Sequence, residues 1–300
     1  MHRAFLSLAL LLTAATLRAE PVLQVATSIP PHKYLIERIG GDRVTARAMV
    51  LPGQNPHTFE PTPKQVGELA RCSLFFSTGM PFEEQLLERL KGIDPGLKVL
   101  DLQEGVAMRK FTQDELDAHE AEEKAAGVHE EEGPGHDESV DPHTWMSPRI
   151  AKQQAETIMK GLAAADPEGA AGYKERYGLL TADLEALDLE LAQTLTPLKG
   201  KDLLVYHPAF GYFADAYGLR QSAVETGGRE PNARQLRDLI KRAKAAGARV
   251  IFVQPQFSKV SAQTVAAQIG GTVVSLDDLA ENYPANLRQI AQSVRANISE

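Results

Sequence analysis

The chain has 300 residues, of which 43% are apolar, 24% charged and 6% aromatic, and its formal net charge is −8. This composition is typical of a folded globular protein and excludes a disordered or collagen-like chain. The acidic balance argues against nucleic acid as a partner, and the single cysteine, Cys72, excludes an intramolecular disulfide and a cysteine-cage zinc site.

Residues 1–19 are predicted to be a secretory signal peptide. Arg3 supplies a positive start, an apolar run follows, and Ala19 ends it with a small residue. The apolar run is shorter than the ~20 residues that a membrane-spanning helix needs. No cysteine lies at the expected cleavage site to carry a lipid. We therefore expect a periplasmic protein that is soluble and not lipidated.

Short apolar runs alternate with amphipathic stretches of helical length, which predicts βα units and parallel sheets. In the first half, strands are expected at 23–28, 44–50, 74–77 and 98–102, with helices at 31–39, 62–70 and 82–91. In the second half, strands are expected at 203–206, 221–224, 250–253 and 272–276, with helices at 210–217, 232–246, 258–269 and from about 286. The fold class predicted is therefore α/β, with two βα lobes.

Residues 167–199 are predicted to form one long connecting helix. Apolar residues recur every three or four positions, and Pro197 and Gly200 end the pattern. Such a helix is ~45 Å long at 1.5 Å per residue, enough to brace two lobes. The alternative is an ordinary amphipathic helix packed on one lobe. The bracing interpretation makes 20–166 the N-terminal lobe and 200–300 the C-terminal lobe.

The segment 112–141 differs from the rest of the chain, because it holds twelve acidic residues and one lysine, Lys124. It has little apolar content with which to offset the entropy of ordering, so we expect a mobile loop. His119, His129 and His136 lie within it. The segment is either a solvated acidic insert or a weak cation collector beside a stronger site.

Three further histidines lie at junctions between predicted elements, each beside a proline. They are His57, His143 and His207. Ligands of parallel sheets lie outside the carboxyl ends of the strands, and His57, His207 and Asp277 all follow predicted strands. Three imidazoles and a carboxylate can form a four-coordinate zinc site, although copper and nickel also suit imidazole. Another histidine, His32, lies in the first turn of a predicted helix and is interpreted as a surface or capping residue.

Three neighbours of these residues complete the candidate site. Trp145 is expected to form apolar surroundings for His143, and Asp278 is the alternative to Asp277 as a ligand. Glu60 is the carboxylate nearest to His57 in sequence and would be the general base of a zinc hydrolase. Its Glu-Pro context fits a structural turn better.

Four motifs together resemble one known family. They are the block Val50-Leu-Pro-Gly-Gln-Asn-Pro-His-Thr-Phe-Glu-Pro-Thr-Pro63, Asp141-Pro-His-Thr-Trp145, Tyr206-His-Pro-Ala-Phe210 and Leu276-Asp-Asp-Leu279. In this order they resemble the zinc- and manganese-specific solute-binding proteins of ABC importers (metal-binding cluster A-I), over essentially the whole chain after the signal.

The resemblance implies two βα lobes joined by a long rigid helix, with metal in the interlobe cleft. It implies His57, His143 and His207 as ligands, and Asp277 as the fourth ligand, a place that some zinc members leave to water. Manganese-selective members tend to carry glutamate at the third position, so His207 favours zinc over manganese. The family often has a histidine-rich loop, whereas the loop here is richer in glutamate.

The function predicted is capture of zinc outside the cytoplasm and its delivery to a membrane permease, by a monomer that is not an enzyme. Protonation of the imidazoles, with an ordinary pKa of ~6.5, is expected to weaken binding below neutral pH. Two alternatives stay open at this point. One is a zinc-dependent hydrolase, and the other is an adhesion or interaction protein with a structural metal.

Overall fold

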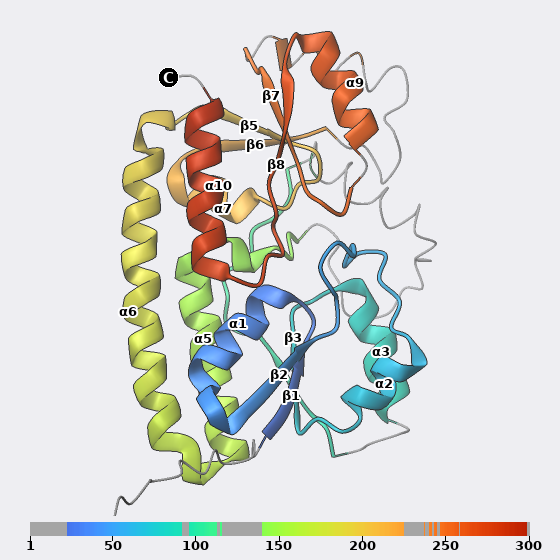
Figure 1. The fold of residues 1–300 in the computed structure, drawn as a ribbon, viewed down its shortest axis with the longest axis vertical. Coiled ribbons are helices and arrows are strands. Elements are labelled where there is room, and N and C mark those ends of the chain that lie inside the picture. Colours follow the sequence, from blue (N-terminus) through green and yellow to red (C-terminus); the bar gives the residue numbers. More distant parts are fainter. Residues whose placement is uncertain are drawn as a thin grey trace, which may run out of the picture.

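The computed structural model describes residues 23–91, 96–112, 115, 140–224, 237, 240–241, 243–244, 247–257 and 259–298. Two four-stranded parallel sheets organise these residues (Figure 1). The first sheet has the order β2-β1-β3-β4 and comprises β1 Leu23–Thr27, β2 Val44–Ala48, β3 Leu74–Ser77 and β4 Lys98–Asp101. The second has the order β6-β5-β7-β8 and comprises β5 Asp202–Val205, β6 Arg220–Ala223, β7 Val250–Val253 and β8 Thr272–Ser275. The two predicted βα lobes are thus confirmed, and their strand orders are equivalent.

Helices connect and cover the strands. They are α1 Pro30–Gly40, α2 Pro63–Leu69, α3 Pro81–Lys91, α5 Pro148–Ala165, α6 Ala170–Leu195, α7 Gly211–Tyr217, α9 Lys259–Ile269 and α10 Tyr283–Asn297. Four short 3-10 turns are added, at η1 Gly41–Arg43, η2 Thr144–Met146, η3 Pro167–Gly169 and η4 Thr196–Leu198. The start of α2 shows how local sequence sets such a boundary, because Thr62 and Gln65 form a reciprocal capping box there.

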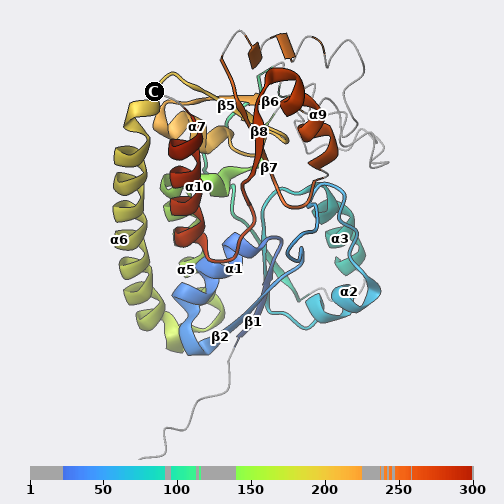
Figure 2. The same cartoon turned by 45° about the horizontal axis from the view of Figure 1, so that its top comes forward.

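The long helix α6 runs alongside both sheets (Figures 1 and 2). It has 26 residues, and η3 and η4 continue it at its two ends. Its buried positions include Leu180, Leu184, Leu187 and Leu191, which share one face at helical spacing. The predicted long connecting helix is therefore confirmed, as an α-helix with a 3-10 turn before and after it.

A helical layer forms around α6. Helix α6 contacts α5, which was not among the predicted helices, and also α1 and α10. The last helix therefore returns from the second sheet to lie beside α6 (Figure 1). The exact division of the chain at 166 and 199 stays a prediction. The signal at 1–19, most of the helix expected at 232–246 and nearly all of the acidic segment lie outside the described residues.

The central strands of both sheets are buried on both faces. All four residues of β3 and all four of β7 are buried, as expected for parallel strands covered by helices. Cys72 is also buried, which agrees with a packing role. No helix within the described ranges is long and apolar enough to cross a membrane.

Candidate metal centre

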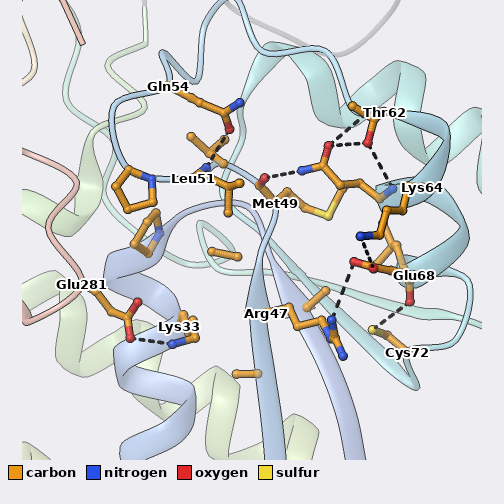
Figure 3. A pocket seen from close by; sticks show the side chains of 18 residues that line it. Lys33, Arg47, Met49, Leu51, Gln54, Thr62, Lys64, Glu68, Cys72 and Glu281 are labelled. Carbon is orange, nitrogen blue, oxygen red and sulfur yellow. Dashed lines mark hydrogen bonds and ion pairs between the residues drawn. The ribbon is translucent and has the colours of Figure 1, made fainter. Parts of the chain in front are cut away.

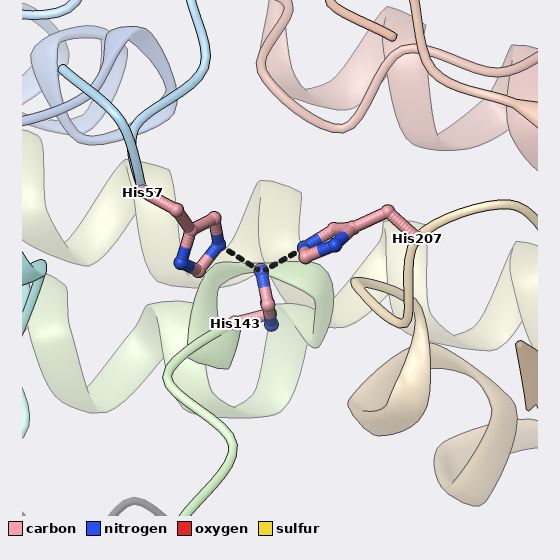
Figure 4. Close-up of side chains that lie close together, drawn as sticks. All are labelled: His57, His143 and His207. Carbon is pink, nitrogen blue, oxygen red and sulfur yellow. Dashed lines mark hydrogen bonds between the residues drawn. The ribbon is translucent and has the colours of Figure 1, made fainter. Parts of the chain in front are cut away.

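Three imidazoles meet between the two lobes, as Figure 4 shows. His57 lies in the loop from β2 to α2, His143 directly precedes η2, and His207 follows β5. The Nε2 atom of His143 lies 3.2 Å from Nε2 of His57 and 3.2 Å from Nε2 of His207. All three residues are buried. Residues separated by up to 150 positions in sequence thus present ring nitrogens to one point.

The distances between these nitrogens fit a metal ion. Zinc binds imidazole nitrogen at about 2.0–2.1 Å with tetrahedral angles, which places two ligand nitrogens about 3.3 Å apart. The two observed separations are 3.2 Å. Within the described part of the chain, the group of metal-ligand atoms lying within 4.8 Å of one another consists of these three histidines. The arrangement is a ready-made three-nitrogen site.

The ring of His143 is oriented by a buried carboxylate. Oδ1 of Asp141 lies 2.7 Å from Nδ1 of His143 and accepts a second hydrogen bond of 3.0 Å from its backbone nitrogen. A carboxylate on Nδ1 favours the tautomer in which Nδ1 carries the proton. The Nε2 atom of His143 then presents a lone pair toward the other two imidazoles, and the carboxylate limits the rotation of the ring.

The loop of His207 is held from the end of a neighbouring strand. Gln254 follows β7, and its Nε2 donates to the carbonyl oxygen of His207 at 2.9 Å. The ring of Phe257 stacks on the His207 imidazole with centroids 4.9 Å apart and planes at 21°. Both contacts limit the rotation of His207, so less entropy is lost when it binds a ligand.

The two aspartates proposed for the fourth position occupy different environments. Asp277 is partly buried, and its Oδ1 accepts a 2.8 Å hydrogen bond from the backbone nitrogen of Leu279. Asp278 is buried and accepts a 2.8 Å hydrogen bond from Gln256. Burial raises the pKa of Asp278 to about 6, although Gln256 and the charge of His207 act to lower it. Neither carboxylate belongs to the described three-nitrogen group.

Trp145 is buried beside His143, whereas Glu60 is exposed to solvent. The indole of Trp145 is 1% exposed, and its ring centroid is 5.2 Å from that of His143. Its Nε1 donates to the carbonyl oxygen of Asp278 at 2.8 Å. Glu60 is exposed. The three histidines of the acidic segment, His119, His129 and His136, lie outside the described residues.

The prediction for His32 is wrong. Its side chain is fully buried, Nδ1 lies 3.0 Å from Oγ1 of Thr78, and Nε2 lies 3.1 Å from Oε1 of Gln154. Burial lowers the pKa of His32 to about 4, so it is neutral at pH 7. The helix α1 turns this position toward α5 and the end of β3, which the local sequence does not reveal.

Several residues that shape the site carried little or no signal in the sequence. Gln254 could have been found, because it directly follows a predicted strand. Asp141 belongs to a quoted motif but was not given a role. Phe257 and Arg109 lack a recognisable pattern. Nη1 of Arg109 lies 3.1 Å from Oδ2 of Asp141. Burial acts to lower the pKa of Arg109, but the surrounding carboxylates outweigh it and raise the pKa above its ordinary value.

A separate pocket of about 540 Å³ opens on the first lobe beside β2 (Figure 3). Its charged side chains pair with one another, as Lys33 does with Glu281 at 2.5 Å and Lys64 with Glu68 at 3.9 Å. None of the three converging histidines lines it. The pocket is therefore distinct from the metal centre.

Two parallel βα lobes, a shared long helix and a nitrogen-rich ligand cluster between the lobes define a solute-binding protein for a metal cation. Residues 25–297 match the family of the periplasmic zinc-uptake complex component A, ZnuA, and the chain belongs to this family.

Individual relatives agree with this assignment. A crystal structure of ZnuA is similar with a TM-score of 0.82 and 34% identity, covering 93% of this chain and all of that one. The high-affinity zinc uptake system protein ZnuA of Bacillus subtilis (strain 168) is 27% identical over 260 residues, covering 86% of this chain and 78% of the relative. The zinc-binding lipoprotein AdcA of Streptococcus pneumoniae is 27% identical over 255 residues, and this chain spans 49% of its length.

Proposed function

We propose that this protein captures zinc outside the cytoplasm and delivers it to the membrane permease of an ABC importer. Zinc-uptake proteins of its family work together with a permease and an ATPase. The observation that carries the proposal is the convergence of three buried Nε2 atoms between the lobes, with that of His143 lying 3.2 Å from each of the other two.

The donor set favours zinc over manganese. Imidazole suits zinc, whereas manganese prefers carboxylate, carbonyl and water oxygens. The ligand from the second lobe is His207, where an oxygen donor would improve a manganese site. Asp141 adds a buried carboxylate behind His143, which strengthens the imidazole as a donor. Zinc is therefore the cargo that the site residues suit best.

The distribution of ligands over two lobes supports reversible capture. His57 and His143 belong to the first lobe and His207 to the second. A relative movement of the lobes would remove one imidazole while leaving two in place. Zinc affinity falls when a ligand is withdrawn, so a partner that separates the lobes would promote release.

We also propose Asp277 as the fourth ligand, with Asp278 as its alternative. Both lie on the loop after β8, in the second lobe. Asp277 has a second carboxylate oxygen besides the Oδ1 that binds Leu279, and it is less deeply buried than Asp278. This loop would have to move for a carboxylate oxygen to join the three nitrogens, since neither aspartate belongs to the described group.

The same proposal includes three narrower points. The protein binds zinc without catalytic turnover: its family is one of zinc-uptake components, and Glu60, the base named for the hydrolase alternative, is exposed. It acts as a monomer, since the three imidazoles of one chain meet without needing a residue from a second subunit. It is periplasmic, in line with its family and the predicted signal at 1–19, and it carries no lipid, since the one cysteine of the sequence, Cys72, is buried in the first lobe.

Metal analysis and titration test the proposal. The protein is purified without added metal, analysed for bound zinc and manganese, stripped with a chelator and titrated with each ion. We expect one tight zinc site per chain and weaker manganese binding. A protein that takes up no zinc, or prefers manganese, would contradict the proposal. Light scattering and mass spectrometry of the exported form test the monomeric state and the absence of lipid.

A further inference from the structure

Arg109 lies at the centre of a cluster of carboxylates beside the metal centre. Its Nη1 is 3.1 Å from Oδ2 of Asp141, and its Nη2 is 2.8 Å from Oε1 of Glu115. Its Nε is 3.0 Å from Oδ2 of Asp215 on α7. The arginine side chain is 12% exposed, whereas Asp141 and Glu115 are at most 1% exposed. The planar guanidinium can serve several carboxylates at once, which a lysine cannot.

One branch of this cluster leads to His143, one of the two ligands from the first lobe. Asp141 uses Oδ2 for Arg109 and Oδ1 for His143, so one carboxylate joins the guanidinium to the imidazole. Without Arg109, Asp141 would be a buried carboxylate with its Oδ2 contact removed. Removing the ion pair of a buried carboxylate is unfavourable, so the carboxylate would shift from its place between Arg109 and His143. This shift would loosen the ring of His143.

A second branch leads to the second lobe's ligand. Oε1 of Glu115 accepts a 2.7 Å hydrogen bond from Nε2 of Gln221. The side chain of Gln221 in turn holds the loop after His207, since its Oε1 accepts from the backbone nitrogen of Phe210 at 2.6 Å and its Nε2 donates to the carbonyl oxygen of Pro208 at 3.3 Å. Arg109 therefore reaches the loops of two ligands from different lobes.

Tyr212 on α7 reinforces the connection between the lobes. Its hydroxyl accepts a 2.8 Å hydrogen bond from the backbone nitrogen of Arg109 and donates one of 2.9 Å to the carbonyl oxygen of Asp141. Together with Asp215, it fixes the segment that carries Arg109 on the second lobe. Backbone and side chain of Arg109 are both constrained.

We propose that Arg109 is a positioning residue for zinc capture. It keeps His143, through Asp141, and the His207 loop, through Glu115 and Gln221, at the separation that zinc requires. Its removal lowers zinc affinity although it touches neither the imidazoles nor the cation. This inference rests on the proposed function, because it concerns the same site.

Competition titration with a chromophoric zinc chelator tests the inference on the full exported chain. Arg109→Met removes the charge and retains an apolar stem, and we expect it to weaken zinc binding about 10-fold or more, as changes around metal-ligating histidines do. Arg109→Lys keeps the positive charge but loses the planar guanidinium that binds several carboxylates, so its zinc affinity should lie between those of Arg109→Met and the wild type. Cobalt bound to Arg109→Met should show a changed visible absorption band, which a purely structural loss would not produce.

A double-mutant cycle tests whether Arg109 acts on the metal centre through Asp141. In an Asp141→Asn background, Arg109→Met should cost less affinity than it does in the wild type, because the arginine acts through the carboxylate. The matched control is Arg43→Met. Arg43 also binds a carboxylate, that of Asp166, through two hydrogen bonds of 2.7 and 2.8 Å, and this pair is not part of the metal centre. We expect Arg43→Met to change thermal stability and leave zinc affinity unchanged.

The outcomes separate the inference from the proposed function. A folded Arg109→Met protein with zinc affinity within twofold of the wild type would overturn the inference alone. Equal affinity losses in Arg109→Met and Arg43→Met would also overturn it, because they would indicate a general effect of stability. A wild-type chain that binds no zinc would overturn the proposed function itself.

Discussion

The indole Nε1 of Trp145 donates a 2.8 Å hydrogen bond to the carbonyl oxygen of Asp278. This bond joins the segment that carries His143 to the loop after β8 that carries both candidate aspartates. The bond is buried, and the indole also lies 5.2 Å from the imidazole of His143, measured between ring centroids. The two sides of the candidate site are therefore connected by one side chain.

Trp145 is the only tryptophan in the sequence, so its fluorescence should report zinc binding. We expect the emission of the metal-free protein to change on addition of one equivalent of zinc. Trp145→Phe should remove the signal and destabilise the fold by about 1–3 kcal/mol, because the carbonyl of Asp278 loses its buried partner. Fluorescence titration and urea unfolding measure the two effects. Emission that stays unchanged when zinc binds would contradict the placement of Trp145 beside the metal centre.

Each of the three histidines should be required for tight binding. His57→Ala, His143→Ala and His207→Ala are expected to weaken zinc binding by more than about 100-fold, since each removes a ligand rather than a supporting group. Zinc should stabilise the wild type against unfolding by about 4 kcal/mol at a concentration 1,000 times its Kd, and stabilise the variants much less. Titration calorimetry and thermal unfolding with and without zinc provide the measurements.

The two aspartates should differ from the histidines and from each other. We expect Asp277→Ala to weaken zinc binding less than any histidine variant does, because water can replace a single carboxylate ligand. Asp278→Ala should weaken it least. A larger loss for Asp278→Ala, with the fold intact by circular dichroism, would assign the fourth position to Asp278.

The buried imidazole of His32 should make stability depend on pH. Its pKa is lowered to about 4 in the folded protein, below the ordinary 6.5. Between pH 4 and 6.5, His32 therefore binds a proton more readily in the unfolded chain than in the folded one. The free energy of unfolding should therefore fall as the pH drops from 6.5 to 4, by about 3 kcal/mol in full. Urea unfolding of metal-free protein, compared with His32→Gln, isolates this contribution. An equal pH dependence in the two proteins would contradict it.

Glu83 should act in the opposite direction. Burial raises its pKa to about 7, although Ser28 and the backbone nitrogens of Thr78 and Gly79 donate to its carboxylate. The folded state then binds the proton more readily, so stability should rise as the pH falls from 7 to 4.5. Glu83→Gln should remove this rise. Chelator-treated protein is again required, so that the metal ligands do not contribute.

The sequence predicted the fold well because hydrophobic periodicity carries it. The apolar runs that became β3 and β7 are buried on both faces, and the leucine spacing of α6 follows one helical face. His32 was misjudged because its environment comes from Thr78 and Gln154, 46 and 122 residues away. Local sequence holds no trace of such contacts.

The site was predictable only in part, for the same reason. The proline-flanked motifs pointed to His57, His143 and His207, but no spacing argument could show that their rings converge. The role of Arg109 was invisible, because its partners Asp141 and Asp215 lie 32 and 106 residues away. Tertiary packing alone brings these charges together.

The acidic segment 112–141 includes residues that support the metal centre. Glu115, near its start, binds Arg109, so a deletion that includes this residue would disturb the metal centre as well. Replacing residues 117–138 by a short Gly/Ser linker avoids this. We expect calorimetry to show the tight zinc site retained and weaker zinc binding lost. Loss of the tight site would place its ligands in the segment instead.

X-ray absorption at the zinc edge of the one-to-one complex tests the central claim most directly. Convergence of His57, His143 and His207 predicts three imidazole nitrogens at about 2.0–2.1 Å and one further light ligand. The His207→Ala complex should show one imidazole fewer. A zinc shell made of oxygens, or one unchanged by that substitution, would contradict a site built between the two lobes.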